Sequence, residues 1–252
     1  MTPKRLRGNV CFINLSWWFM PVFMRLLLLI LIAVFSYPGY AQGSDVRTVL
    51  DTLIHSYGGE NNLQKLDSMV QEWDMVALMR KTHGTDTRSI QAPDKLRVDL
   101  SYPDKSETRI LNGDIGHVIF EGKSPERVSG IQLVAMQLQL MRLYSPLMLR
   151  NKIDSVSLIE QGGLLALSLV ENGVHVHYMV NKDKWLIEKV AGTIIMNGGE
   201  IQFLTEYSDF SVVEGVLMHH KENKFAAGMN TAVLQLRKVT FDVKFDANRF
   251  RP

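Results

Sequence analysis

Apolar and polar residues alternate along several stretches of this chain, and that pattern limits it to a fold built on half-buried strands. Residues 95–102 alternate without an exception, as a strand with one buried face requires. The apolar positions with this period of two are Leu96, Val98, Leu100 and Tyr102; Val174, Val176, Tyr178 and Val180; Ile201, Phe203 and Tyr207; and Val233, Val239, Phe241, Val243 and Phe245.

Dipeptides that accept the positive φ of tight hairpin turns separate these stretches. They are His83-Gly84, Asn112-Gly113, Gly162-Gly163, Asn172-Gly173 and Asn197-Gly198. The spacing predicts a meandering antiparallel sheet of about ten strands. Because strand twist accumulates, a sheet of that length must curl or close, so we expect a barrel or an incomplete barrel in a mainly β (α+β) fold.

Three segments are predicted to be helical. Residues 45–57 carry apolar side chains at i, i+3, i+4 spacing, follow a capping Ser44 and end at Gly58-Gly59, and a second short helix is expected over 60–66. Residues 129–150 predict a helix that is apolar nearly all round, with its polar seam at Gln132, Gln139 and Arg142. Such a helix is either a central core helix or one covered by the sheet and by a further element, a partner or an apolar ligand.

The N-terminal region has the pattern of a secretory signal. Arg25 precedes an apolar stretch over 26–35, and the small residues Gly39 and Ala41 follow. We therefore expect cleavage near Ala41, a single domain over 42–252, export across the inner membrane to the periplasm, and Met24 as a possible true start. An uncleaved membrane anchor over 17–35 is the alternative.

Charge and cysteine content narrow the function of the mature chain. Four of the 28 Lys and Arg residues and none of the 26 acidic residues precede residue 42, so the mature net charge is about −2. That balance gives no reason to expect binding to nucleic acid. Cys11 is the only cysteine and lies before the expected cleavage site, so the mature domain has no thiol for a disulfide, a soft metal or a lipid anchor.

Catalytic and metal-binding motifs are weak. His175 and His177 share a strand face at a spacing that zinc could use, but only one of His219 and His220 could join them, and no carboxylate or cysteine completes the set. The chain contains no nucleophile elbow, zinc-protease motif or dinucleotide fingerprint. We predict no enzyme activity, cofactor or metal; an envelope hydrolase using these histidines is the alternative.

Several short stretches together resemble the outer-membrane lipoprotein carrier (LolA/LolB-like) family. They are Ala92-Pro93-Asp94-Lys95-Leu96-Arg97-Val98-Asp99-Leu100, Tyr102-Pro103-Asp104-Lys105-Ser106-Glu107, Leu111-Asn112-Gly113-Asp114, Val118-Ile119-Phe120, Gly58-Gly59 with Leu63 and Leu66, and the closing Phe245-Asp246-Ala247-Asn248-Arg249-Phe250-Arg251-Pro252. The resemblance implies an incompletely closed antiparallel barrel with helices over its concave face, an apolar cavity for acyl chains, and residues 129–149 as a lid. Family members often carry a basic residue before the first proline to hold the lid, where this chain has Ala92, so Arg88 or Arg97 is a candidate replacement unless both are ordinary solvated arginines.

The methionines of this chain suit the cavity that the resemblance implies, since methionine's deformable apolar side chain adapts to chains of variable shape. The candidate lining residues are Trp73, Met75 and Met79, the last two on one strand face with Trp73; Leu96, Val98, Leu100 and Phe120; and Met136, Leu140 and Met141 on the lid. A methionine-tolerant packed core is the alternative. The predicted function is a periplasmic carrier or chaperone for lipid or lipoprotein acyl chains that contacts a membrane or membrane protein transiently; the alternative is a sensor or regulatory binding module of the same fold.

Overall fold

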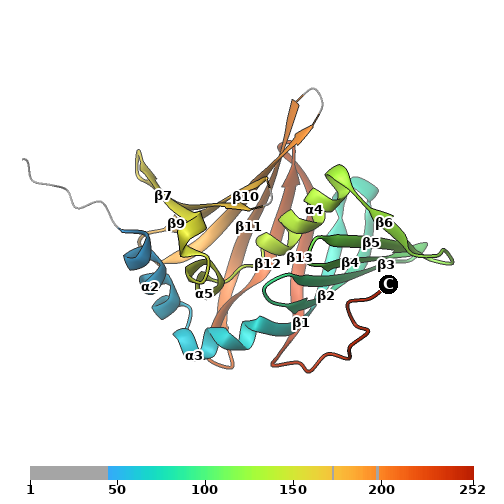
Figure 1. Ribbon diagram of the computed structural model, residues 1–252, viewed down its shortest axis with the longest axis horizontal. Helices are drawn as coiled ribbons and strands as arrows, with labels where there is room; N and C mark the ends of the chain where they lie inside the picture. The colour runs from blue at the N-terminus through green and yellow to red at the C-terminus, as the bar shows by residue number, and fades with distance from the viewer. Residues whose placement is uncertain (1–44, 172, 197–198) are drawn as a thin grey trace, which may run out of the picture. The chain divides into compact units, whose positions relative to one another are not determined.

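One long antiparallel sheet curls around the helices of the protein (Figure 1). The computed structural model describes residues 45–171, 173–196 and 199–252. Within these ranges, thirteen strands follow the order β6-β5-β4-β3-β2-β1-β13-β12-β11-β10-β9-β8-β7, so the first and last strands meet in the middle and the sheet stays open between β6 and β7. This confirms the predicted incomplete barrel, with more strands than expected.

The strands are β1 Ser68–Ala77, β2 Thr82–Gln91, β3 Lys95–Tyr102, β4 Lys105–Asn112, β5 Ile115–Phe120, β6 Glu126–Val128, β7 Val156–Gln161, β8 Leu164–Glu171, β9 Val174–Asn181, β10 Leu186–Met196, β11 Gly199–Val213, β12 Val216–Ala226 and β13 Met229–Phe241. The helices are α2 Val46–Ser56, α3 Glu60–Leu63, α4 Gly130–Met141 and α5 Pro146–Arg150, with short 3-10 turns at Gln64–Asp67, Leu78–Arg80 and Ile153–Ser155. No helix in these ranges has both the length and the apolar character needed to cross a bilayer.

Two of the five predicted turns are confirmed. Gly113, Gly162 and Gly163 have φ of 60°, 58° and 84° in hairpin turns, while Asn197-Gly198 and Asn172 fall outside the described residues. The turn at His83-Gly84 is wrong, because Gly84 lies inside β2 opposite Met75. A Cβ on Gly84 would lie 2.9 Å from Tyr102 Cδ1, so this glycine permits close strand approach instead of a turn.

The strand alternation holds in β3 and β9 and changes phase in β13. Val174, Val176, Tyr178 and Val180 are all buried. In β13 the buried positions are Ala232, Leu234 and Leu236, whereas Val233 is half-buried. A register shift opposite Glu72 and Trp73 then turns Phe241 inward, and the strand ends there instead of at residue 245. A bulge, which adds one residue to one strand, explains why a constant period of two is wrong here.

The predicted helix over residues 45–57 is confirmed, but the predicted long helix over 129–150 is two separate helices. Helix α2 buries Val49, Leu50, Leu53 and Ile54; Asp45 stands at its N-cap, and Ser44 lies outside the described residues. The expected single helix over 129–150 divides into α4 and α5. Pro146 begins α5, and the Ser145 side chain accepts from Met148 N–H, because proline cannot continue a helix but suits its first turn.

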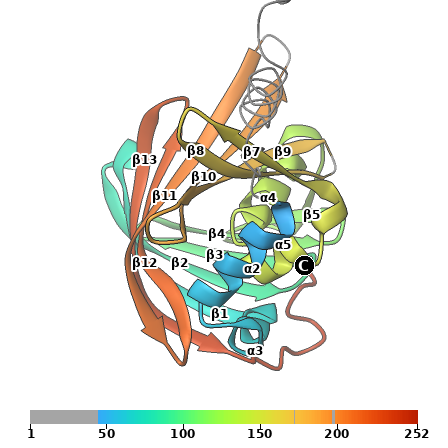
Figure 2. The same cartoon turned by 90° about the vertical axis from the view of Figure 1, so that its left-hand side faces the viewer.

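All of these helices lie inside the curve of the sheet (Figure 2). The cross-strand row Gln71, Arg88, Val98, Arg109 and Val118 belongs to this concave face, since Arg109 and Val118 line a pocket together with α4 residues. The C-terminal segment covers part of the opposite, outer face. There Arg249 donates to Ser89 Oγ at 2.8 Å and pairs with Asp99 at 3.3 Å, and Phe250 is buried.

Candidate ligand cavity beneath helix α4

Helix α4 packs against two glycines that lie in the two halves, or arms, of the curved sheet, on either side of its central β1–β13 pair. A Cβ on Gly192 of β10 would overlap Leu138 of α4 and lie 3.1 Å from its Cγ. A Cβ on Gly116 of β5 would lie 3.1 Å from Leu133 Cδ1 and 3.2 Å from Met136 Sδ. Because glycine lacks a side chain at both points, the helix approaches the sheet closely and spans the gap between its arms.

Two tyrosines of the sheet hold the C-terminal end of α4. Tyr178 Oη donates to the Met141 carbonyl, and Tyr207 Oη donates to the Arg142 carbonyl, each at 2.7 Å. The last carbonyls of a helix have no partner within the helix, so these hydroxyls satisfy groups that would otherwise be buried unpaired. Burial raises the pKa of both tyrosines, which therefore remain neutral donors. One end of α4 is thus anchored to the sheet.

Open space flanks α4 on two sides. Pocket A, of about 280 Å³, lies between α4 and strands β4 to β6 and is lined by Glu107, Arg109, Val118, Phe120, Glu126, Val128, Gln132, Ala135, Met136 and Gln139. Pocket B, of about 310 Å³, is lined by Pro93, Asp94, Leu111, Gly113, Asp114, Gln137, Leu140, Met141, Tyr144, Lys152 and Glu171. The expected single apolar cavity is therefore divided, because α4 and its side chains occupy the middle of the concave face.

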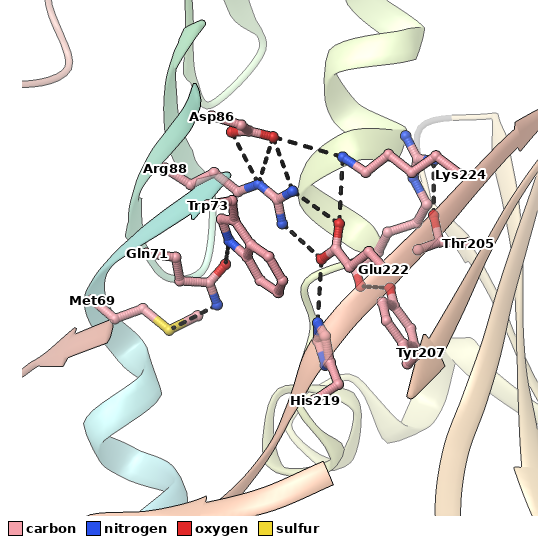
Figure 3. A network of polar contacts seen from close by, with 11 residues as sticks. Met69, Gln71, Trp73, Asp86, Arg88, Thr205, Tyr207, His219, Glu222 and Lys224 are labelled. Atoms are coloured by element: carbon pink, nitrogen blue, oxygen red, sulfur yellow. Dashed lines mark hydrogen bonds and ion pairs between the residues drawn. The ribbon is translucent and has the colours of Figure 1, made fainter. Parts of the chain in front are cut away.

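A buried ionic cluster lies on the concave face near the C-terminal end of α4 (Figure 3). Arg88, 1% exposed, bonds Glu222 at 2.8 and 2.9 Å and Asp86 Oδ2 at 2.9 Å. Lys224 Nζ lies 3.4 Å from Glu222 and 3.8 Å from Asp86, and His219 Nε2 lies 3.2 Å from Glu222. Although burial alone would raise the pKa of Glu222, Arg88 and Lys224 hold it well below its usual range.

Aromatic rings frame this cluster. The Arg88 guanidinium stands 4.9 Å from the Trp73 ring centre, and Trp73 Nε1 donates to Gln71 Oε1 at 3.1 Å. His219 stacks on Trp73 with ring centres 5.6 Å apart, and its ring centre lies 4.2 Å from that of Tyr207 at a tilt of 35°. Rings of this kind exclude water and orient the charged groups, so the ionic side chains are held in fixed positions within a mostly apolar face.

The structure brings nine of the ten predicted cavity residues to the concave face or to pockets A and B. Trp73, Met75, Leu96, Val98 and Leu100 are buried beneath the helices. Phe120 and Met136 line pocket A, and Leu140 and Met141 line pocket B. That any of them contacts a ligand stays a prediction.

The tenth candidate cavity residue, Met79, and one candidate lid-holding arginine, Arg97, lie elsewhere than the sequence predicted. Met79 lies in the turn after β1 and is 61% exposed, so the prediction that it shares a strand face with Trp73 is wrong. Arg97 lies on the outer face with Asp99 at 3.0 Å and cannot hold α4. Arg88 faces α4 but is bonded to Asp86 and Glu222, so the solvated interpretation of this arginine is wrong.

The histidine pair that the sequence singled out is not assembled into a metal centre. His175 is exposed and His177 is half-buried on the outer face of β9. Among the described residues, no group of three or more His, Cys, Asp and Glu side chains is arranged to hold a metal ion.

The sequence reasoning missed Tyr178 and Tyr207 as α4 anchors and missed the pairing of Asp86 and Arg88 with Glu222 and Lys224. In the sequence, both tyrosines could be identified only as positions on the buried face of a predicted strand. The cluster joins β2 to β12, and its partners are 134 residues apart in sequence, so no local pattern could have shown the pairing.

Comparison with known proteins identifies the fold class. No protein-family model matches the sequence, and no curated protein is significantly similar to it. Among solved structures, a LolA superfamily protein from Nitrosomonas europaea superposes with a TM-score of 0.55 at 12% identity, covering 83% of this chain and 99% of that one. A DUF1329 family protein from Desulfovibrio piger gives 0.50 at 10% identity, covering 81% and 96%.

A third structure, a putative outer membrane lipoprotein-sorting protein domain from Vibrio parahaemolyticus, gives a TM-score of 0.49 at 9% identity, covering 82% of this chain and 97% of that one. An open antiparallel barrel with helices over its concave face is the class of protein that the fold defines. The chain has the LolA-like fold, and the resemblance found in the sequence is confirmed at the level of the fold.

Proposed function

We propose that this protein is a periplasmic carrier that binds an apolar chain, of a lipid or of a lipoprotein, between the curved sheet and helix α4. The observation that carries the proposal is the incomplete seating of α4. It buries Met136, Leu138, Leu140 and Met141 against the sheet, yet pockets A and B lie along its flanks and Ile131 is 45% exposed.

A displacement of α4 would join the two pockets into one groove along the apolar side chains of the helix and the sheet. Each acyl CH₂ group buried there contributes about 0.8 kcal/mol, so a chain of ordinary length binds without any specific polar contact. Binding of this kind needs no covalent chemistry, and we propose no enzymatic activity. The apolar signal-like segment supports export, and the LolA-like fold supports a role in handling lipids or lipoproteins.

Native mass spectrometry tests this function. The full chain is expressed with its own N-terminal segment, purified from the host without detergent, and its bound lipid is extracted and identified. We expect a lipid to co-purify and to be lost in Ala135→Trp, because that side chain fills pocket A. Ile131→Trp, on the exposed side of the same helix, is the matched control and should keep the lipid. A lipid-free protein that also takes up none from vesicles would reject the carrier and favour a regulatory binding module.

A further inference from the structure

The ionic cluster beneath α4 carries more positive than negative charge. Arg88 and Lys224 face Asp86 and Glu222, and those four charges balance. Arg142, at the C-cap of α4, adds a further positive charge to the same lining of the small space that also includes Arg88, Glu222 and Lys224. Arg142 is half-buried and, among the described residues, forms no ion pair with a carboxylate, so this arrangement favours an added anion.

Arg142 is the group with spare hydrogen-bonding capacity. Its guanidinium carries five N–H donors, and the hydrogen bond it makes in the structure runs from Nη1 to Thr205 Oγ1 at 3.2 Å. Thr205 is the direct cross-strand partner of Lys224, so Arg142 and Lys224 flank the same hydroxyl. A guanidinium, an ammonium and a hydroxyl arranged around one space are the groups that bind a carboxylate or a phosphate.

The position of this space relates it to the proposed ligand groove. Gln139 lines both pocket A and the small space beside Arg142, so the two adjoin along one turn of α4. A chain that occupies pocket A would therefore bring its end group to Arg142. Burial is the main cause that lowers the pKa of Lys224 to about 8, and the nearby Arg88 and Arg142 charges lower it further.

We propose that the ligand of this protein is an anionic amphiphile whose carboxylate or phosphate binds between Arg142, Lys224 and Thr205, with its apolar chain along α4. The space between these three residues is about 10 Å³, so the same displacement of α4 that admits the chain must enlarge it for the anionic group. This inference rests on the proposed function and specifies its ligand class. It also assigns Arg142 a role that is separate from its backbone carbonyl, which Tyr207 already holds.

The test compares two ligands that share a chain and differ only in charge. Decanoate and decanol are titrated calorimetrically into the full-length protein, and inorganic phosphate is titrated separately. A charge-assisted hydrogen bond is worth about tenfold in affinity, so decanoate should bind about tenfold or more tightly than decanol, and phosphate far more weakly than either. Arg142→Gln should bring the ratio close to one without weakening decanol. Arg142→Lys should keep most of the preference.

Arg97→Gln is the matched control, because it removes the same kind of charge from the outer face of the same sheet. It should leave both affinities unchanged. Equal binding of decanoate and decanol to the wild type, or a preference that survives Arg142→Gln, would overturn the anionic site and leave the carrier intact. Binding of neither ligand would overturn both proposals. Phosphate binding as tight as that of decanoate would show a site for a free anion and would overturn the amphiphile assignment.

Discussion

Two helical elements cover the concave face of this sheet, and they do so in different ways. Helix α5 is packed over most of its surface: Pro146, Leu147, Met148 and Leu149 are all buried, α2 lies against it, and a small space of about 70 Å³ adjoins its first residue. Arg150 at its end pairs with Glu60 at 2.6 Å and with Asp51 at 3.4 Å. Helix α4 is anchored at its C-terminal end, contacts the sheet at two glycines and has open pockets on its flanks.

The two ends of the concave face therefore have different roles, one in stability and the other in the proposed binding. The α2–α5 end is a closed core whose loss should unfold the domain. The α4 end combines an apolar helix, adjoining space and buried charge, which is what a binding site needs and a core does not. Substitutions that affect one of these two ends more than the other therefore test whether they differ in this way.

The largest expected effect is at the closed end. Leu149→Ala removes a side chain that is 0% exposed, and it should lower the free energy of unfolding by about 2–5 kcal/mol. Leu164→Ala, at a position that is 44% exposed, is the control and should cost no more than about 0.5 kcal/mol. Denaturant titration of both variants measures the difference. Similar losses would mean that α5 is not packed as a core.

A smaller effect is expected in the pH dependence of the free energy of unfolding, through the ionisation of Lys224. Its pKa is lowered to about 8 in the folded protein from its ordinary value of 10.5, so above pH 8 the unfolded chain binds more protons than the folded one. Stability from this group therefore rises with pH, by about 2 kcal/mol between pH 8 and 9.5. Lys224→Met should remove that rise when unfolding is measured at both pH values. An identical pH dependence in the variant would show that Lys224 is not responsible.

The tyrosine anchors should affect α4 alone. Tyr207→Phe leaves the Arg142 carbonyl without its donor, at a cost of about 1–3 kcal/mol to the seated position of the helix. Hydrogen exchange of the α4 amides should then accelerate about tenfold, because the helix detaches more often. Amides of α5 serve as the internal control and should be unchanged. Acceleration at both ends would mean that the two covers open as one unit.

The smallest effect should be on the exposed side of α4. Ile131→Gln should change the free energy of unfolding by no more than about 0.5 kcal/mol, since the side chain is already 45% exposed. Thermal denaturation is sufficient to check this. A loss of several kcal/mol would show that this side of α4 is covered in the folded protein.

The sequence was informative where burial follows a local period. Leu96, Val98 and Leu100 were placed correctly because one face of β3 is buried along its length. The reasoning was wrong in β13, where a bulge at the pairing with Glu72 and Trp73 reverses the phase. It was also wrong for the long helix, although Pro146 was available as a signal that the helix ends.

Much of the candidate site depends on contacts that are distant in sequence. Asp86 and Arg88 were polar residues in a strand, and their inward orientation became clear only when Glu222 and Lys224 were placed beside them. Arg97 shows the converse, since its outward position is set by the phase of β3. A period of two identifies which residues share a face but does not identify which polar face is covered by another element.

The central claim is that α4 must move to admit an apolar chain, and a cross-link across its contact with β10 tests this directly. A Cβ on Gly192 would lie 3.1 Å from Leu138 Cγ, so cysteines at these two positions are close enough to be joined, and Cys11→Ser removes the one native thiol. In the Leu138→Cys/Gly192→Cys variant, the oxidised protein should bind a fluorescent fatty acid about tenfold or more weakly than the reduced protein, which should bind as the wild type does. Equal binding by the oxidised and reduced forms would contradict the account.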